Sequence, residues 1–479
     1  MRITTSGIHT STAVAVLALC VIAAFVMTAS SEEIQADTEV TVGGHHYTLN
    51  DSGAVYNGPV NATGDVTIPE YIEYGGQRYT VYSIWIDYNG ESIRTLSIPS
   101  TITAYRLPLL SHNESNLVSI AVDPDNIRLS AEDGILYDTM TSSLICYPQM
   151  RSGSSFTVPS WVETIGVGAF QYSDLRSVEL SNVVTIEDRA FWNCTGLTSV
   201  SIPSTVRDIV QGAFTGCSGI TSFSVDSENP TYTSDNGVLF NEDMTEIVKY
   251  PSGRTSSSYT IPDSVRTIGY GAFWTADRLT SVYIPGSVTS IGENAFLSAP
   301  LTEVDIPSSV RTIERNAFRF TEASSVIIRG DNVSIGSEAF YGVDNLRDIW
   351  FLGTIGQLAS DAFAMGTNGP DACTVHSYYN VNLSAYSDGL THFTYENIGT
   401  PPEEPVEPDD PDVPDEPDVD PNPEPDTPSE PDNPQTPGQG DDGDPSTDDL
   451  TRIYLNAVFL VAFIVVMFVN ILLYVRIKM

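Results

Sequence analysis

The sequence predicts a β-solenoid, a fold in which short strands wind into coils that stack on one another. Three observations predict it. Eight Phe residues each follow an Ala and recur mostly every 21 to 23 residues, an Ile or Leu stands five residues before each Phe, and an Ile-Pro or Val-Pro pair begins 12 residues before five of them. A period in the low twenties that is held by apolar positions is typical of proteins in which each repeat is one coil. The eight are Phe170, Phe191, Phe214, Phe273, Phe296, Phe318, Phe340 and Phe363.

Each coil is expected to contain one strand followed by a return segment. In residues 279–296, the apolar residues Val282 and Ile284 alternate with their neighbours, which is the period of a strand with one buried face. Pro285 follows directly and has no N–H group for a sheet, so it ends the strand. Ile291 and Phe296 then return the chain to the core along the opposite wall of the coil.

Two insertions interrupt the period. One gap in the Phe series is 59 residues long, and residues 122–170 have a counterpart 103 residues later in residues 225–273. In each copy an Asp-Gly or Asn-Gly pair, at 133–134 and at 236–237, precedes an apolar run, a polar turn and a second apolar run. Such pairs are typical of tight hairpin turns. We therefore expect two inserted β-hairpins that lie on the solenoid.

Residues 32–120 are expected to form an N-terminal cap with degenerate repeats. The pairs Ile68-Pro69 and Ile98-Pro99 keep the end of the strand, but no Ala-Phe pair follows them. A terminal coil must cover the apolar core with a more polar face, so atypical repeats are expected at this end.

The repeated Ile-Pro, Ile-Gly and Ala-Phe elements resemble the BspA-like leucine-rich repeats known from Treponema surface proteins, over most of residues 60–365. The resemblance implies a curved solenoid with a parallel sheet on its concave side. It also implies a family of mostly microbial cell-surface proteins, several of them associated with adhesion to host or neighbouring cells. It implies no particular ligand, because repeat folds host many. We assign residues 121–397 to this leucine-rich repeat solenoid, with coils of about 22–23 residues and a C-terminal cap.

The two ends of the chain predict export and membrane attachment. Residues 1–31 are expected to be a signal peptide, because Arg2 precedes an apolar stretch and small residues allow cleavage before Glu32; an uncleaved anchor is the alternative. Residues 453–475 are apolar and long enough for a transmembrane helix. Basic residues favour the cytoplasmic side, so residues 476–479 are expected to be a cytoplasmic tail. This predicts a single-pass protein of the cell membrane whose solenoid is extracellular.

An acidic, Pro-rich linker, residues 398–450, is expected to join the solenoid to this helix. Residues 401–450 hold 15 of the 30 Pro and 19 of the 62 acidic residues of the chain, without a Lys or an Arg. This composition favours extended polyproline II structure and cannot bury a core. The formal net charge of −41 argues against nucleic acid and anionic lipid headgroups as partners.

No residue pattern predicts a catalytic centre, a metal site or a cofactor. The sequence has no Gly-rich phosphate loop, no nucleophile elbow and no zinc spacing, so we expect a protein that is not an enzyme. His45 and His46 adjoin Gly43-Gly44, but adjacent residues of a strand point to opposite faces. We interpret this segment as a hairpin turn in the cap.

Two cysteines occupy equivalent positions of consecutive coils. Cys194 and Cys217 each stand three residues after a Phe of the series. Equivalent positions of stacked coils lie about 4.8 Å apart, which is within the range that a disulfide accepts. The alternative is that each thiol serves as a small buried hydrophobic group.

The residues beside each inward-facing Val are predicted to point out onto the concave face. In the early coils they are mainly Ser, whereas in the later coils they are aromatic, aliphatic or acidic. Exposed aromatic residues rimmed by charge are common anchors of a protein interface or a sugar-stacking site. We therefore predict that a protein or glycan partner binds six residues: Tyr283, Glu303, Asp305, Ile327, Asp348 and Trp350.

Two alternatives compete with this binding surface. The solenoid can be a structural envelope or spacer protein without a specific ligand, which the uniform Ser residues of the early coils favour. Trp350 can instead pack under the C-terminal cap formed by residues 365–397.

Overall fold

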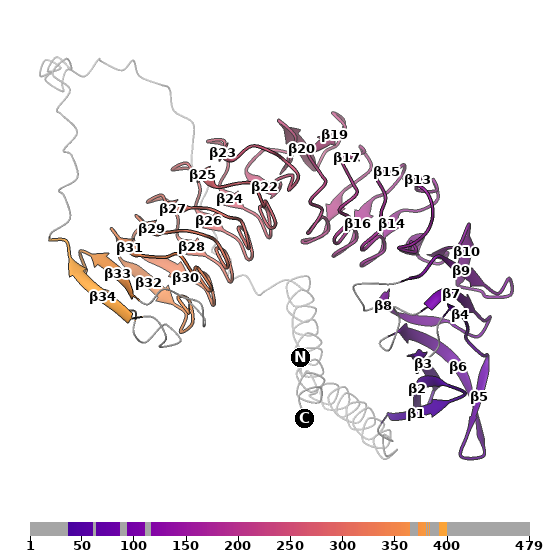
Figure 1. Cartoon of the computed structure of the whole chain (residues 1–479). Coiled ribbons are helices and arrows are strands. Elements are labelled where there is room, and N and C mark those ends of the chain that lie inside the picture. Colours follow the sequence, from indigo (N-terminus) through magenta and orange to yellow (C-terminus); the bar gives the residue numbers. More distant parts are fainter. Residues whose placement is uncertain are drawn as a thin grey trace, which may run out of the picture. The chain divides into compact units, whose positions relative to one another are not determined.

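The computed structural model describes residues 37–60, 64–86, 93–110, 116–364, 372–379, 381, 383 and 392–399. Short strands, β1 to β34, make up the regular structure of this part, and Figure 1 shows them stacked coil upon coil. The predicted β-solenoid is therefore confirmed. The predicted signal peptide, the linker beyond Gly399, the predicted transmembrane segment and the tail lie outside the described residues. Within the described ranges, no helix is long and apolar enough to cross a membrane.

One wall of the coils is a row of parallel strands, which form five separate hydrogen-bonded sheets and which together we call the first ladder. It contains the alternating apolar residues of the repeats, so that Val304 of one coil lies opposite Val326 of the next. The predicted strands and their parallel pairing are confirmed. The members are β4 (Gly64–Thr67), β7 (Ile93–Ile98), β9 (Ser119–Val122), β13 (Ser155–Thr157), β15 (Ser177–Glu179), β17 (Ser199–Ile202), β19 (Ser222–Val225), β23 (Ser258–Thr260), β25 (Ser281–Tyr283), β27 (Glu303–Ile306), β29 (Ser325–Ile328), β31 (Asp348–Phe351), β33 (Ala372–Ser377) and β34 (His392–Asn397).

A second ladder of parallel strands forms another wall. Most of its strands are only two residues long and contribute one Ile to the core, such as Ile291 opposite Ile313. Its members are β6 (Gln77–Ile86), β8 (Ala104–Leu110), β14 (Thr164–Ile165), β16 (Thr185–Ile186), β18 (Asp208–Ile209), β24 (Thr267–Ile268), β26 (Ser290–Ile291), β28 (Thr312–Ile313), β30 (Val333–Ile335) and β32 (Ile355–Leu358). A further strand, β5 (Tyr71–Tyr74), pairs antiparallel with β6.

The Phe series forms the predicted core ladder between these walls. The N–H of Phe296 donates to the carbonyl of Ala317 in the next coil at 2.7 Å, and this bond recurs along the stack. Rings of consecutive coils stack with centroids 4.7–5.3 Å apart and planes within 10° of each other. The stack has two runs. Tyr147 lies before Phe170 in the first run and Tyr250 before Phe273 in the second, at 5.2 and 5.1 Å.

Three antiparallel meanders, each of three strands, divide the described solenoid into blocks. In each meander the third strand also pairs in parallel with the next strand of the second ladder, so the meander opens a new run of coils. The first meander is the N-terminal end of the described chain and the other two are the insertions. They consist of β1 (Thr38–Val42), β2 (His45–Asn50) and β3 (Gly53–Pro59); β10 (Leu129–Glu132), β11 (Ile135–Asp138) and β12 (Ser143–Cys146); and β20 (Tyr232–Asp235), β21 (Val238–Asn241) and β22 (Glu246–Lys249).

The insertions are partitions inside the stack, and the expectation that they lie on the solenoid is wrong. Both faces of each middle strand are buried. In β11, Leu136 packs into the core of the preceding block, while Ile135 and Tyr137 pack into the core of the following block. In β21, Leu239 faces the preceding core and its neighbours face the next. A strand that is apolar on both faces must be covered on both, so it cannot rest on the outside of a coil.

The hairpin turns themselves are confirmed. Asp133 and Gly134 have φ of 51° and 80°, and Asn236 and Gly237 have 47° and 77°, as a two-residue turn between antiparallel strands requires. Glycine is also needed for space, because a Cβ on Gly134 would lie 2.5 Å from the Ser119 hydroxyl oxygen. The Gly43-Gly44 pair forms the matching turn between β1 and β2.

Candidate binding surface

The candidate surface is the outward face of the last five strands of the first ladder, β27, β29, β31, β33 and β34. Val304, Val326 and Ile349 point into the core and are buried. The residues on either side of them are exposed or half-buried, which confirms that they point away from the core. Figure 1 draws these strands along the outer curve of the coils and the second ladder along the inner curve, so the expectation that this sheet is concave is wrong. That this face binds a partner remains a prediction.

The parallel register arranges these outward residues in two rows across the sheet. Neighbouring strands are about 4.8 Å apart, so the side chains of each row lie next to one another. One row contains Asp305, Ile327, Trp350, His376 and Glu396, and the other contains Glu303, Ser325, Asp348, Thr374 and Thr394. Five of the six predicted site residues thus share one sheet.

Tyr283 belongs to a neighbouring sheet. It lies on β25, whose ladder partner is β23, although β25 also contacts β27. Its side chain is 61% exposed, the most exposed large aromatic group among the described residues. Tyr283 therefore stands at the border of the five-stranded sheet.

Arg329 pairs with Asp305 and was not predicted. Its Nε and Nη2 atoms donate to the two carboxylate oxygens of Asp305 at 2.7 and 2.9 Å. These hydrogen bonds, together with the charge of Asp305, raise the pKa of Arg329 despite the opposing effect of partial burial. The sequence holds a signal for this pair. Arg329 follows Ile328 at the position where five of the coils carry the Pro of the Ile-Pro or Val-Pro pair.

Trp350 forms a cluster with the first cap strand. Its ring stacks on the ring of His376 with centroids 3.8 Å apart and planes 9° apart. Nε2 of His376 lies 2.9 Å from Oδ1 of Asp348, and Nδ1 lies 2.9 Å from a carboxylate oxygen of Glu396, outside hydrogen-bond geometry. His376 is buried and Trp350 is half-buried. The alternative that Trp350 packs against the cap is thus true for one face of its ring.

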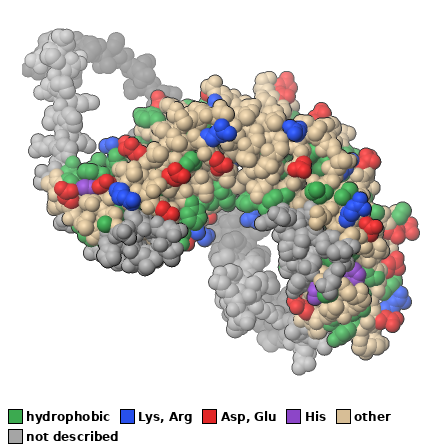
Figure 2. All heavy atoms as spheres, viewed as in Figure 1, with side chains coloured by type: hydrophobic (Ala, Val, Ile, Leu, Met, Phe, Trp, Pro, Cys, Tyr) green, Lys and Arg blue, Asp and Glu red, His purple; other side chains and the backbone are tan. Residues whose placement is uncertain are grey.

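The surface carries both charge signs and apolar groups. Figure 2 shows acidic, basic and apolar side chains interspersed on the visible face, without a broad patch of one sign. A row that offers two aromatic rings, an aliphatic side chain and an ion pair can bind a partner through stacking and directed polar contacts.

Sequence reasoning also missed a groove in the Ser-rich early strands. It has a volume of about 390 Å³ and is lined by Glu179, Leu180, Ser181, Ser201, Pro203, Ser224, Val225 and Asp226. Its lining mixes polar and apolar side chains of β15, β17 and β19 and of the residues that follow these strands. The early face is therefore not flat, although its side chains are as uniform as predicted.

The structure also locates the other candidate residues. His45 and His46 point apart, since His45 Nδ1 lies 3.0 Å from the Tyr56 hydroxyl while His46 Nδ1 lies 3.4 Å from the Thr41 hydroxyl. No group of three or more potential metal ligands occurs in the described part of the chain.

Cys194 and Cys217 are free and buried. Their thiols donate to the carbonyls of Phe170 and Phe191 at 2.9 and 3.0 Å. The structure therefore has the two small buried groups and not the disulfide.

Comparison with known proteins identifies the repeats. The sequence model of the BspA type leucine rich repeat region matches residues 145–253 and 250–368, with six copies. No curated protein matches the chain.

Several solved structures are similar. A leucine rich cell surface protein from Faecalibacterium prausnitzii has 21% identity and a TM-score of 0.49, over 74% of this chain and 98% of that one. The pneumococcal vaccine antigen PcpA has 20% identity and a TM-score of 0.47, over 76% and 99%. A leucine-rich repeat protein from Eubacterium ventriosum has 17% identity and a TM-score of 0.38, over 75% and 85%.

Proposed function

Residues 145–368 of this chain are a BspA-type leucine-rich repeat region, and from this premise we propose that the protein is a membrane-anchored, extracellular recognition protein. Its task is to bind a protein or glycan on a host or neighbouring cell. The binding surface is the outward face of β27, β29, β31, β33 and β34, with Tyr283 at its border. The protein is proposed to act by binding and not by catalysis.

The observation that carries this proposal is the contrast between the two ends of the first ladder. The early strands present Ser199, Ser201 and Ser224, whose short side chains offer little area for contact. The late strands present the Trp350–His376 stack, Ile327 and the Asp305–Arg329 pair within one sheet. Aromatic and Arg side chains contribute most of the binding energy in known interfaces. A spacer without a ligand gives no reason for this change of composition.

The ends of the sequence support presentation on a cell surface. A signal-like start and an apolar segment before a basic tail favour a single membrane span with the solenoid outside. The acidic linker, if fully extended at about 3.1 Å per residue, reaches roughly 150 Å. Such a spacer would carry the solenoid beyond the membrane to a partner on another cell.

The proposal is tested by binding of the full chain, displayed on cells, to arrays of extracellular matrix proteins and of glycans. The decisive variant combines Tyr283→Ala, Asp305→Ala and Trp350→Ala. The matched control combines Ser199→Ala, Ser201→Ala and Ser224→Ala on the early strands. We expect the first triple variant to lose at least tenfold in affinity and the second to bind like the parent chain.

Two results would contradict the proposal. One is unchanged binding by the first triple variant while circular dichroism shows an intact solenoid, which would exclude this face. The other is the absence of binding to any protein or glycan, which would favour the structural spacer.

A further inference from the structure

At the start of each internal meander, the same Asn hydrogen bonds join the meander to the preceding coil, and we call each such place a junction. Asn126, just before the second meander, donates from Nδ2 to the carbonyls of Pro99 and Ile102, both at 2.9 Å. Asn229, 103 residues later, donates to Pro203 and Val206 at 2.7 and 3.1 Å. In both cases the side-chain oxygen accepts from the two backbone N–H groups that start the meander. The two junctions therefore have equivalent backbone arrangements, so their side chains can be compared position by position.

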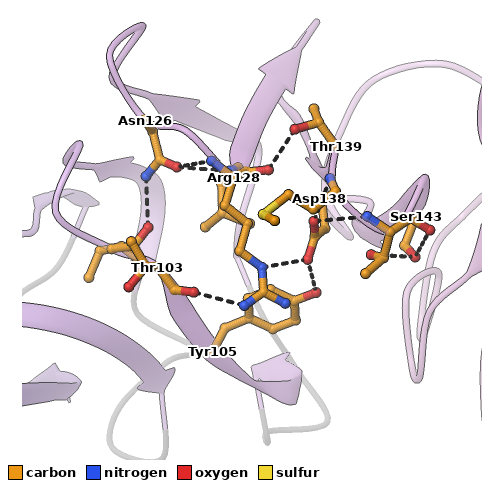
Figure 3. A network of polar contacts seen from close by, with 11 residues as sticks. Thr103, Tyr105, Asn126, Arg128, Asp138, Thr139 and Ser143 are labelled. Atoms are coloured by element: carbon orange, nitrogen blue, oxygen red, sulfur yellow. Dashed lines mark hydrogen bonds and ion pairs between the residues drawn. The ribbon is translucent and has the colours of Figure 1, made fainter.

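An arginine fills the first junction. Figure 3 shows Arg128 between the end of one coil and the meander. Its Nε donates to Oδ2 of Asp138 at 2.8 Å and its Nη1 to the Thr103 carbonyl at 2.8 Å. The Tyr105 hydroxyl donates to the same Asp138 oxygen at 2.7 Å, and the guanidinium carbon lies 4.8 Å from the centre of the Tyr105 ring. Asp138 is fully buried, so the guanidinium neutralises it there.

The second junction has lost this arginine. The residues 103 positions after Tyr105, Arg128 and Asp138 are Asp208, Thr231 and Asn241. All three line a cleft of about 470 Å³ between β18 and the third meander. The shorter side chains therefore leave space where the first junction holds a guanidinium and an aromatic ring.

The cleft has an aromatic ring at a different position and gains carboxylates. Tyr232 lines it, and its hydroxyl accepts from the Ile209 N–H at 2.8 Å. Asp208 and Glu246 lie near this hydroxyl, and their charges help to raise the pKa of Tyr232, which burial raises most. Glu246 is half-buried, and burial raises the pKa of its carboxyl group. No Lys, Arg or His in the described ranges lies within ion-pair distance of either carboxylate.

Lys249 lies at the cleft wall, but its ammonium group is already hydrogen-bonded to the backbone. Its Nζ donates to the carbonyls of Gly271 and Trp274 at 2.8 and 3.2 Å. These bonds direct two of its three N–H groups to the backbone. The cleft therefore offers an incoming group an aromatic ring and two uncompensated carboxylates, while its one cation is held elsewhere.

We propose that this cleft binds the guanidinium group of an arginine side chain supplied by another molecule. The guest would restore from outside the cation that Arg128 supplies from within at the first junction. Planar guanidinium groups pair with carboxylates in a fork geometry and stack on aromatic rings, and Asp208, Glu246 and Tyr232 offer both kinds of contact. This site is separate from the proposed binding surface on β27–β34, so either proposal can hold without the other.

The test measures binding of two probes to the full chain by calorimetry. Nα-acetyl-L-arginine amide carries the guanidinium, and Nα-acetyl-L-citrulline amide has the same shape without the charge. We expect the arginine probe to bind at least tenfold more tightly. Asp208→Asn combined with Glu246→Gln should weaken it at least tenfold. Glu242→Gln, an exposed carboxylate next to Asn241 but outside the cleft, is the matched control and should change nothing.

A variant that carries the residues of the first junction at the second one tests the equivalence of the two junctions. Asp208→Tyr, Thr231→Arg and Asn241→Asp together rebuild the network of the first junction. We expect this variant to fold, to melt at a higher temperature and to lose the arginine probe.

Three outcomes would overturn the proposal. The first is equal binding of the citrulline probe. The second is no detectable binding of the arginine probe to the parent chain at millimolar concentrations of the probe. The third is binding of the arginine probe that survives the double carboxylate change, which would mean that Asp208 and Glu246 do not hold the guanidinium group.

Discussion

Single residues show how the coils tolerate polar groups in their core. Lys249 is one of only two lysines in the chain and is 6% exposed. Two backbone carbonyls hold its ammonium group, but they do not neutralise its charge. Burial lowers the pKa of Lys249 from 10.5 to about 8. Its equivalent in the preceding block is Cys146, an apolar choice at the same position.

Lys249 should make stability rise with pH in a defined window. The unfolded chain binds the proton more tightly than the folded chain between about pH 8 and 10.5, so unfolding becomes less favourable as pH rises through this range. The shift corresponds to about 3 kcal/mol. Lys249→Met should therefore gain most in unfolding free energy at pH 7 and progressively less up to pH 10. Denaturant titrations of both chains across this pH range measure the difference.

Arg266→Met, which removes an exposed cation, is the control for this experiment and should give a difference independent of pH. A constant difference for Lys249→Met would mean that the amine is not desolvated in the folded chain.

Among the elements, the Phe ladder could be predicted from the sequence, whereas the position of the two inserted meanders inside the stack could not. Strand alternation, the Ile-Pro ends, the Phe stack and the Asp-Gly turns are local patterns, so they could be predicted. The place of each insertion could not be predicted from its turn. However, the run Ile135-Leu136-Tyr137 has no polar position, which indicates a strand buried on both faces. This apolar run would have predicted that the strand lies between two cores.

The candidate surface was predictable to a similar degree. The outward direction of Asp305 and Trp350 follows from period two alone. The contacts of these residues do not, because His376 and Glu396 come from cap strands outside the repeat pattern. Arg329 reaches Asp305 across coils, from 24 residues away. Partners supplied by register between coils are invisible to a pattern within one coil.

The Phe ladder should dominate the stability of the third block. Phe318 is fully buried and stacks on Phe296 and Phe340. Phe318→Ala should cost about 3–5 kcal/mol of unfolding free energy through lost burial and a cavity. Phe320, two residues later and 47% exposed, is the matched control, and its change to Ala should cost less than about 1 kcal/mol. Equal costs for the two variants would show that the stacked rings are not the core.

The two faces of a partition strand should stabilise different blocks. Leu136→Ala should speed hydrogen exchange in β7 and β9 of the preceding block, because Leu136 packs into that core. Tyr137→Ala should speed it in β14 and β16 of the following block. Each change should cost about 2–5 kcal/mol. If both variants loosened the same block, β11 would not separate two cores.

At the scale of the whole molecule, the chain consists of blocks with cores of their own, joined by strands that belong to two cores. Contacts in such a stack connect only neighbours, so stability is close to a sum over coils and their interfaces. This arrangement permits one end of the first ladder to diverge without disturbing the other. The change from Ser-rich rows to the Trp350 and Asp305 rows is therefore compatible with one uniform fold.

Protease treatment of intact cells tests the proposed orientation of the chain. The linker has no Lys or Arg but is rich in Glu and Asp between residues 401 and 450. A Glu-specific protease should therefore cut after Glu403, the one Glu of this stretch that no Pro follows, and release the solenoid as a soluble fragment, whereas trypsin should not cut within the linker. If the solenoid stayed protected from the Glu-specific protease until the membrane was broken, the proposed topology would be wrong.

The most direct measurement of the central claim is hydrogen exchange of the full chain with and without its bound partner, once the binding arrays have supplied one. The account predicts slower exchange in β27, β29, β31 and β33, and unchanged exchange in β15, β17 and β19. Protection confined to the early strands, or to no strand of the first ladder, would contradict it.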